Sequence, residues 1–421
     1  MDPLAPRREP SAVPTLTRRE LLRGGALGGL ALFLAACGGQ TAPTPSELSV
    51  GSPAPGSPTP LSASSTPAAS ASAPAASPSA PLALREKIAG LLIVGFRGSR
   101  LDQTPWLRTA LREGGLGGVI LFDRDQLTGA RRNVLSPDQV ATLVGDLRAA
   151  AGRRRIIVSI DEEGGIVTRL SPAHGFPAVA SEGDIGRGSD ATARTWAKTI
   201  ATTLANAGIN LNFAPVVDLD VNPKSPAIGA LDRSFSADPD VVVERATIEI
   251  EAHRAVDVRT TLKHFPGIGS STTNTDFGVA DVTKTWSRTE LQPFQSLIVS
   301  GHADLVMAGH VVNGQLDATG RPASLSAPIV TDLLRGELAW SGVVVTDDLQ
   351  AAAITKTFGR DEAILLALEA GNDLLLLANQ QVYDPRIVTR VVDVVEGAVG
   401  SGRLKASRID EAFDRVRAAF P

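Results

Sequence analysis

The chain repeats one pattern eight times: a short run of apolar, mostly β-branched residues followed by a segment with helical spacing of apolar positions. The runs lie at residues 91–96, 118–122, 156–161, 211–219, 259–265, 305–310, 342–348 and 373–379. Segments typical of helices lie between them, among others at 137–150, 190–207, 239–255, 326–337 and 361–371. Continuously apolar strands indicate a sheet covered on both faces, as in parallel strands joined by helical crossovers. The pattern predicts an α/β fold of the (β/α)8 TIM-barrel type, and a doubly wound open sheet is the alternative.

Polar residues stand at the C-terminal ends of several of these runs. They are Asp161, Lys263, His264, His310 and Asp347. One such residue is often a helix cap or a surface group, but the C-terminal ends of barrel strands all meet at one mouth, where active sites are built. Because five polar residues share that position, we predict that they face a common catalytic site.

The first part of the chain has the features of an export signal. Arg18 and Arg19 precede an apolar run, 24–36, which ends in "LAAC". The run is shorter than the roughly 20 residues that a membrane-spanning helix needs. Residues 1–37 resemble a twin-arginine lipoprotein signal peptide, which implies that Cys37 becomes the lipidated N-terminus and that the protein is an exported lipoprotein of the cell membrane. An uncleaved membrane anchor is the alternative.

Residues 38–81 are rich in Ser, Pro, Ala and Thr and are predicted to form a disordered linker. Residues 82–421 have the composition of one globular domain. Cys37 is the only cysteine, which excludes a disulfide, a cysteine nucleophile or a cysteine metal site in that domain. The net charge of −4 at pH 7 argues against a nucleic acid partner. The histidines lack metal-ligand spacing, and no metal or organic cofactor is implied.

Seven motifs occur in an order that is typical of one enzyme family. They are "DEEGGIVTR" (161–169), "NFAPVVDLDVNP" (212–223), "IGALDRSF" (228–235), "KHFPG" (263–267), "MAGH" (307–310), "PASLS" (322–326) and "VVVTDDL" (343–349). The domain resembles glycoside hydrolase family 3, in particular the single-domain β-N-acetylglucosaminidases of bacterial cell-wall recycling. The resemblance implies a retaining hydrolase that removes terminal β-linked N-acetylglucosamine, and hence a carbohydrate partner.

The resemblance also implies roles for individual residues. Asp347, the first aspartate of "TDDL", is the implied nucleophile that forms a glycosyl-enzyme intermediate. Asp348 is expected to be structural, because neighbouring positions at a strand end point in opposite directions. The implied sugar-binding residues are Asp161, Arg169, Arg233, Lys263 and His264, with Met307 and His310 near the pocket. His310 can equally be a buried structural histidine, and Met307 a core residue.

The loop after "KHFPG" departs from the family pattern. Relatives carry an Asp-x-His pair that acts as acid/base, and the corresponding residues here are Asn274 and Asp276. Ile268 and Ile166 replace a histidine and an arginine that relatives commonly carry. Three hypotheses follow: Asp276 is the acid/base with Asn274 beside it, the protein binds sugars but hydrolyses them poorly, or another carboxylate such as Asp281 serves. We favour the first, because an acidic side chain occupies the position of the acid; it requires a raised pKa of Asp276.

Two functions from other classes also fit parts of the pattern. A lysine at a barrel strand end, Lys263, can form a Schiff base in an aldolase-type reaction. The second function is that of a lipoprotein that binds glycans without cleaving them, since a fold does not guarantee catalytic activity. A β-glucosidase of the same family is a third possibility.

Overall fold

The computed structural model describes residues 82–421. The predicted signal peptide with Cys37, and the predicted linker, lie outside the described residues. Between residues 82 and 421, no helix combines the length and the apolar character that crossing a membrane requires.

All eight predicted strands are present, each somewhat shorter than its apolar run. They are β1 (Leu92–Gly95), β2 (Gly118–Ile120), β3 (Ile157–Ile160), β6 (Leu211–Asn212), β7 (Thr261–Phe265), β9 (Leu305–Ala308), β11 (Val343–Thr346) and β12 (Leu375–Leu377). Every residue of β1 is buried, as are those of β3, β7 and β11. The continuous apolar runs therefore correspond to strands that are covered on both faces.

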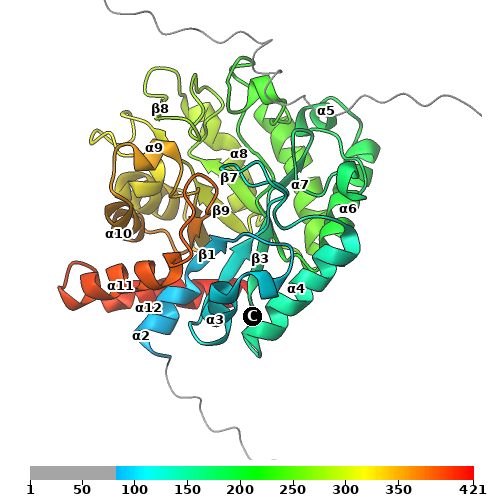
Figure 1. Ribbon diagram of the computed structural model, residues 1–421. Coiled ribbons are helices and arrows are strands. Elements are labelled where there is room, and N and C mark those ends of the chain that lie inside the picture. The colour runs from blue at the N-terminus through cyan, green and yellow to red at the C-terminus, as the bar shows by residue number, and fades with distance from the viewer. Residues whose placement is uncertain (1–81) are drawn as a thin grey trace, which may run out of the picture. The chain divides into compact units, whose positions relative to one another are not determined.

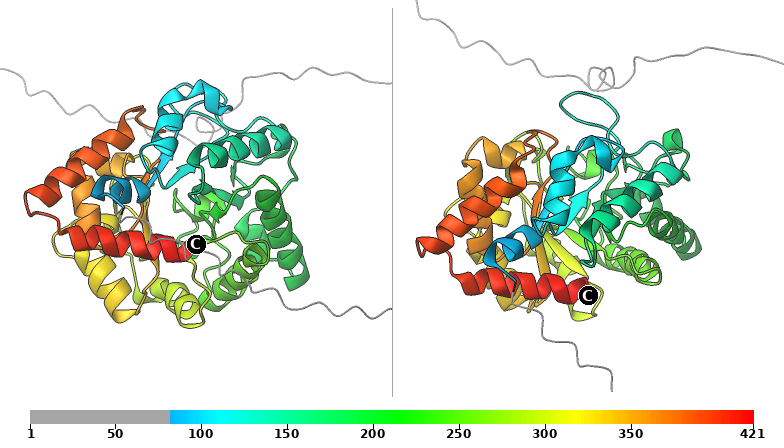
Figure 2. Two further views of the ribbon diagram at one scale, coloured as in Figure 1. Left: turned by 90° about the horizontal axis from the view of Figure 1, so that it is seen from below. Right: turned by 60° about the horizontal axis from the view of Figure 1, so that its bottom comes forward.

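The strands pair in parallel and form two sheets. One sheet has the order β12-β1-β2-β3-β6 and the other the order β11-β9-β7. Isolated parallel bridges join the sheets at both edges, Val216 with Lys263 on one side and Val345 with Leu374 on the other. The architecture is thus an α/β fold with parallel strands in the middle and helices around them (Figures 1 and 2).

The helices cover the outside of the strands (Figure 1). They are α2 (Leu84–Gly90), α3 (Pro105–Arg112), α4 (Pro137–Ala151), α5 (Glu182–Gly186), α6 (Asp190–Asn206), α7 (Pro239–Arg254), α8 (Gln292–Val299), the π-helical η6 (Pro328–Glu337), α9 (Ala352–Thr355), α10 (Arg360–Ala370), α11 (Ile387–Gly400) and α12 (Ala406–Ala419). The five predicted helical segments correspond to α4, α6, α7, η6 and α10.

Local sequence explains where several helices begin. Ser136 and Ser189 precede α4 and α6, and each side chain accepts a hydrogen bond from the backbone N–H three residues later. Asp238 accepts a hydrogen bond from the backbone N–H of Asp240, two residues later, at the start of α7. Such caps satisfy backbone donors that have no partner within the helix.

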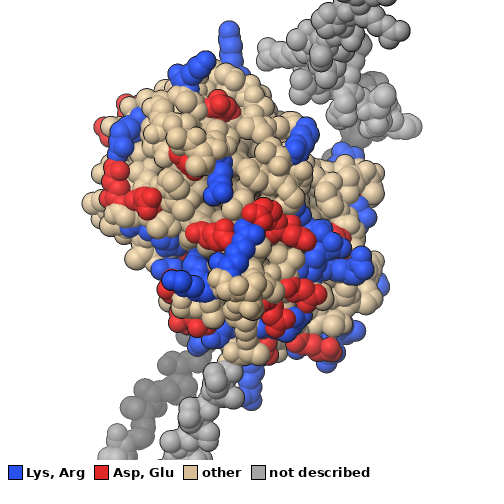
Figure 3. Space-filling view, turned by 90° about the vertical axis from the view of Figure 1, so that its left-hand side faces the viewer, with Lys and Arg blue, Asp and Glu red and all other residues tan. Residues whose placement is uncertain are grey.

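Charged side chains of both signs gather on the outer face that contains α10 and α11 (Figure 3), where Arg403 forms ion pairs with Glu362 and Glu369.

Short elements decorate the segments that follow the strands. The hairpin β4 (Glu162–Gly164) and β5 (Val167–Thr168) follows β3, while β8 (Ala280–Asp281) pairs with β10 (Val311–Val312) after β7 and β9. The 3-10 turns are η1 (Leu101–Gln103), η2 (Pro172–His174), η3 (Gly229–Leu231), η4 (Arg288–Leu291) and η5 (Ala323–Leu325). Glu163 of β4, Val167 of β5 and Leu231 of η3 line a pocket at the C-terminal ends of the strands.

Candidate active site

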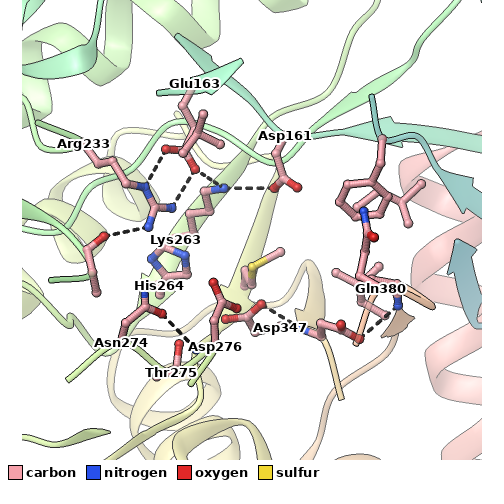
Figure 4. Close-up of a pocket in the computed structure, with 18 of the residues that line it drawn as sticks. Asp161, Glu163, Arg233, Lys263, His264, Asn274, Thr275, Asp276, Asp347 and Gln380 are labelled. Carbon is pink, nitrogen blue, oxygen red and sulfur yellow. Dashed lines mark hydrogen bonds and ion pairs between the residues drawn. The ribbon is translucent and has the colours of Figure 1, made fainter. Parts of the chain in front are cut away.

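A pocket of about 190 Å³ lies where the predicted polar residues converge. The residues predicted from the sequence that line it are Asp161, Arg169, Arg233, Lys263, His264, Asn274, Asp276, Met307 and Asp347. They come from β7 and β9 and from the segments that follow β3, β6, β7 and β11 (Figure 4). Residues more than 180 positions apart in sequence, such as Asp161 and Asp347, thus face one cavity. The structure therefore brings together nearly all residues that the sequence assigned to the site.

His310 is the predicted pocket residue that does not line the cavity. Its side chain is buried, with Nδ1 2.7 Å from the hydroxyl of Ser324 and Nε2 2.7 Å from the backbone carbonyl of Asp348. Both ring nitrogens are therefore engaged behind the pocket wall. The ring supports the strand end that carries Asp347 and Asp348 rather than contacting a ligand.

Asp347 is held as an anion. Burial opposes its ionisation, but the nearby rings of His310 and His264 outweigh that effect and lower the pKa of Asp347 below its usual value. The backbone N–H of Asp348 also donates to Oδ1 of Asp347 at 2.7 Å. A carboxylate that is ionised at neutral pH and faces a cavity can act as a nucleophile.

A chain of alternating charges forms one wall of the pocket (Figure 4). Glu163 receives two hydrogen bonds from Arg233, at 2.8 and 2.7 Å, and its Oε1 lies 2.6 Å from Nζ of Lys263. The same Nζ donates to Oδ1 of Asp161 at 3.2 Å. Burial raises the pKa of Glu163, but the positive charges of Arg233 and Lys263 outweigh this effect and hold the pKa far below its usual range. No role was predicted for Glu163 from the sequence, although it lies in the "DEEGG" motif.

Lys263 remains protonated in this wall. Burial lowers its pKa, but the carboxylates of Glu163 and Asp161 more than compensate, so that the pKa of Lys263 is raised. Asp161 is only partly buried, and Nη2 of Arg169 lies 3.7 Å from its Oδ2. The wall thus presents an ammonium donor and a partly free carboxylate acceptor, the groups that bind sugar hydroxyls.

His264 is oriented by a buried carboxylate. Oδ2 of Asp218 lies 2.7 Å from Nδ1 of His264 and accepts the backbone N–H of the same residue at 3.1 Å. Oδ1 of Asp218 accepts the backbone N–H of Ile268 at 2.8 Å. With Nδ1 engaged, Nε2 is the ring nitrogen left for the pocket. Asp218 was not predicted, because its role depends on a contact with β7 that the sequence does not reveal.

Asp276 extends over the pocket from the loop after β7. The residue as a whole is exposed, yet its carboxyl group faces the cavity beside Asp347 (Figure 4). Burial of this group and the negative charge of Asp347 raise the pKa of Asp276. Asn274 accepts the backbone N–H of Asp276 at 2.9 Å. The amide of Asn274 therefore shapes the backbone of the loop and does not bind the carboxyl group of Asp276.

Asp348 also lines the pocket, in contrast to the expectation that it points away. The reason is that β11 ends at Thr346, so the alternation of side chains along a strand no longer applies at Asp347 and Asp348. Oδ1 of Asp348 accepts the backbone N–H groups of Gln350 and Ala378, at 3.1 and 3.0 Å. Burial, aided by the charge of Asp347, raises the pKa of Asp348 to about 7.

The loop that carries Asp276 is held by residues from distant parts of the chain. Nε2 of Gln381 donates to the backbone carbonyl of Asp276 at 3.0 Å. Nζ of Lys356 donates to the carbonyl of Phe277 at 2.8 Å. These two side chains form a latch from the segments after β11 and β12, and no local sequence signal marked them.

The remaining candidates fall outside the pocket. Asp281 lies in β8, is exposed, and accepts the backbone N–H of Thr283 at 2.9 Å. Hydrogen bonds from the side chain and then from the backbone of Thr283 lower the pKa of Asp281. Ile166 is exposed in the turn between β4 and β5, next to the pocket-lining Val167. Among residues 82–421, no three or more His, Cys, Asp or Glu side chains are grouped as a metal site would need.

A polar pocket at the C-terminal ends of parallel strands is where α/β enzymes carry their active sites. The sequence model described as "Glycosyl hydrolase family 3 N terminal domain" matches residues 83–419. The chain therefore belongs to glycoside hydrolase family 3.

Similar proteins are known from several bacteria. The chain is 33% identical to a beta-hexosaminidase of Tolumonas auensis over 300 residues, covering 69% of this chain and 84% of the relative. It is 30% identical to "Beta-hexosaminidase A" of Pseudoalteromonas piscicida over 326 residues, covering 72% of this chain but only 52% of that relative. A solved beta-N-acetylhexosaminidase from Beutenbergia cavernae superposes with a TM-score of 0.71 at 34% identity, covering 80% of this chain and 98% of that one.

Proposed function

We propose that the protein is a retaining glycoside hydrolase that removes terminal β-linked N-acetylglucosamine, with Asp347 as the nucleophile and Asp276 as the acid/base. The observation that carries this proposal is the pair of carboxyl groups facing one cavity with opposite shifts in pKa. The pKa of Asp347 is lowered and that of Asp276 is raised. When the surroundings push the pKa values of two carboxyl groups apart, the group with the lower pKa is the ionised one and the group with the higher pKa is the acid.

The proposed reaction has two steps. In the first, an oxygen of Asp347 attacks the anomeric carbon, the glycosidic C–O bond breaks, and Asp276 gives its proton to the leaving oxygen. In the second, the now ionised Asp276 removes a proton from water, the water oxygen attacks the anomeric carbon, and the bond to Asp347 breaks. The sugar retains its β configuration and both carboxyl groups return to their starting states.

The charged wall supports the binding of one sugar. Lys263 and Arg233 can donate to hydroxyl groups, and Asp161 can accept from them. The pocket of about 190 Å³ is smaller than the roughly 300–1,000 Å³ of sites for drug-sized ligands. A single terminal ring is therefore the expected occupant, which supports cleavage from chain ends. The proposed specificity for an N-acetylated sugar is based on the similarity of the chain to beta-hexosaminidases.

We infer further that the two sheets form one (β/α)8 barrel. Eight parallel strands and the bridges at both sheet edges support a closed cylinder. A closed cylinder also accounts for the convergence of the strand ends on one pocket.

A Schiff-base mechanism is disfavoured by the state of Lys263. An amine must lose its proton to attack a carbonyl, whereas the carboxylates of Glu163 and Asp161 raise the pKa of Lys263. A binding protein without activity is disfavoured because two carboxyl groups, Asp347 and Asp276, face one cavity, as a retaining hydrolase requires. Asp281, outside the pocket, is disfavoured as that donor.

The test is hydrolysis of aryl β-N-acetylglucosaminides, glucosides and xylosides by wild type, Asp347→Ala, Asp276→Ala and the control Asp281→Ala. We expect cleavage of the N-acetylglucosaminide by wild type and by Asp281→Ala. Asp347→Ala should be nearly inactive. Asp276→Ala should lose a factor of about 10² to 10⁴ on alkyl or oligosaccharide substrates and much less on a dinitrophenyl glycoside, whose leaving group needs little protonation. Equal inactivity of wild type and Asp347→Ala, with sugar binding retained, would mean a binding protein.

The export signal supports a second proposal, that the protein is a lipoprotein anchored through Cys37 and exposed outside the cytoplasm. Metabolic labelling with a fatty acid should label the wild type and not Cys37→Ala. Equal labelling of both would contradict the proposed anchor.

A further inference from the structure

Arg132 is a charged side chain enclosed at the C-terminal ends of the strands. It is buried, and its guanidinium group donates to three backbone carbonyls. Nε donates to Phe96 at 2.6 Å, Nη1 to Asn379 at 3.0 Å and Nη2 to Ala378 at 2.9 Å. Phe96 directly follows β1, and Ala378 directly follows β12, the strand that pairs with β1. Arg132 therefore holds the ends of two neighbouring strands together.

Enclosing this guanidinium group costs free energy. Burial lowers the pKa of Arg132 to about 10, and the carboxyl groups of Asp125 and Asp348 offset this effect only in part. Asp125 lies 3.6 Å from Arg132 and binds Arg97 more closely, at 2.8 Å. A buried charged group is tolerated when it is well hydrogen-bonded. The three carbonyls are therefore the main partners of Arg132, and they connect it to the strand ends.

A path of hydrogen bonds leads from Arg132 to the proposed nucleophile. Ala378, whose carbonyl accepts from Arg132, donates its backbone N–H to Oδ1 of Asp348 at 3.0 Å. The backbone N–H of Asp348 in turn donates to Oδ1 of Asp347 at 2.7 Å. Three successive hydrogen bonds thus connect the guanidinium group with the carboxylate of Asp347.

The segment that carries Asp347 depends on β12 for its position. The segment follows Thr346, which makes the last residue pair of β11 with β9. Further along, the backbone N–H of Leu349 donates to the carbonyl of Leu376 in β12 at 3.0 Å. A displacement of about 1 Å at a reacting group can cost about 10²-fold in rate. A shift at the end of β12 is therefore expected to impair the attack by Asp347.

We propose that Arg132 is a positioning residue for the nucleophile. It fixes the end of β12 against β1, and the contacts of Ala378 and Asp348 then set the direction of the Asp347 carboxylate. Arg132 itself does not line the pocket, so it acts through these residues and not on the sugar. The inference rests on the proposed function, because that function assigns the attack to Asp347.

The test isolates the nucleophilic step with a 5-fluoro derivative of N-acetylglucosaminyl fluoride. An oxygen of Asp347 bonds to the anomeric carbon, the anomeric C–F bond breaks and fluoride leaves with the electron pair. Because fluoride is a good leaving group, the step needs little protonation by Asp276. The ring fluorine slows hydrolysis of the glycosyl-enzyme, so that mass spectrometry can measure the rate at which Asp347 is labelled.

Two variants interrupt the path at different points. Arg132→Lys keeps the charge but lacks the planar fork that reaches three carbonyls. We expect the folded variant to be labelled about tenfold to 10²-fold more slowly than wild type, with an unchanged Kd for N-acetylglucosamine by calorimetry. Asp348→Ala should slow labelling to a similar extent, and it decides the result where Arg132→Lys does not fold. Asp348→Asn keeps an acceptor for Ala378 and should lose less than Asp348→Ala.

Arg335→Lys is the matched control. Arg335 is also largely buried, and its guanidinium group donates to the carbonyls of Gly342 and Gly371 at 3.1 and 2.9 Å. These glycines precede β11 and β12, so Arg335 acts at the ends of the strands that are opposite to the pocket. Arg335→Lys should lower Tm and leave the rate of labelling at the wild-type value.

Two results on labelling would overturn the inference. Labelling of folded Arg132→Lys and Asp348→Ala at the wild-type rate would mean that Asp347 does not depend on this path. An equal loss in Arg335→Lys would assign the effect to general destabilisation. Both results leave the proposed function intact.

A third result would give Arg132 a different role. Arg132 also binds the carbonyl of Asn379, two residues before Gln381, which holds the loop of Asp276. Unchanged labelling of Arg132→Lys with a loss confined to alkyl glycosides would mean that Arg132 positions this loop and not the nucleophile. If wild type is neither labelled nor active on any aryl glycoside, the proposed function fails and the inference fails with it.

Discussion

Replacing Glu163 by glutamine should weaken both the fold and the site, because Glu163 is the carboxylate that separates two cations. The side chain is only 1% exposed, and it accepts contacts of 2.6, 2.7 and 2.8 Å from Lys263 and Arg233. Removing one partner from a buried ion pair costs about 3–5 kcal/mol, since the remaining charge stays buried without compensation. Glutamine keeps the shape and one acceptor oxygen, so we expect a loss of about 3 kcal/mol in the free energy of unfolding.

The dependence of this loss on pH follows from the pKa of Glu163. The folded-state pKa lies far below that of an unfolded glutamate, about 4.3. The stabilisation is therefore complete above about pH 4.3 and is lost as the pH falls toward the folded-state pKa. The difference in stability between wild type and Glu163→Gln should be smaller at about pH 3.5 than at pH 7.

The assay is urea denaturation followed by circular dichroism, together with kcat/KM on an aryl N-acetylglucosaminide. With Arg233 and Lys263 displaced, kcat/KM should fall by about 10²-fold, as expected when groups that position a substrate move by about 1 Å. Glu411→Gln, on the exposed surface of α12, is the control and should change neither quantity. A loss of less than about 1 kcal/mol with an unchanged kcat/KM would refute the reasoning, because it would mean that Glu163 does not hold the two cations.

Three further results are expected. The first concerns the latch on the loop of Asp276, which Lys356→Ala and Gln381→Ala each release. We expect kcat/KM to fall by about tenfold to 10²-fold on an alkyl glycoside but little on a dinitrophenyl glycoside. Equal losses on both substrates would contradict a role of the latch in positioning Asp276 as the acid. The pH profile of kcat/KM should be bell-shaped, because activity is lost as the pH falls through the lowered pKa of Asp347 and as it rises through the raised pKa of Asp276. Asp276→Asn should remove the alkaline limb, and a limb that survives would assign the acid to another group. Asp218→Asn should raise KM by about tenfold, because His264 and the turn at residue 268 both lose the carboxylate that holds them. An unchanged KM would mean that the orientation of His264 does not contribute to sugar binding.

The position of Asp347, the proposed nucleophile, could be predicted from the sequence because strand ends are a local feature. An apolar run that stops at Thr346 marks the following aspartates as residues of the strand end, wherever the other strands lie. The same reasoning identified Asp161 and Lys263. It was wrong in directing Asp348 away from the pocket, which both aspartates line, because a strand-end pattern carries no information on the direction of side chains after the last ladder pair.

The residues that the sequence analysis missed share a different property. Asp218, Gln381 and Lys356 act through contacts with segments between 46 and 105 positions away. Glu163 is similar, since its partners Arg233 and Lys263 are 70 and 100 positions distant. No single-sequence pattern reports such pairings.

The sequence by itself determined the strands, most of the helices and the kinds of chemical group that stand at the strand ends, because apolar periodicity and helix caps depend on neighbouring residues. Tertiary structure decided which of those groups meet. It placed His310 behind the pocket wall and brought the carboxyl group of Asp276 over Asp347. The physical reason is that pKa, burial and access to a ligand are set by atoms close in space, and in this protein most of those atoms belong to distant parts of the chain.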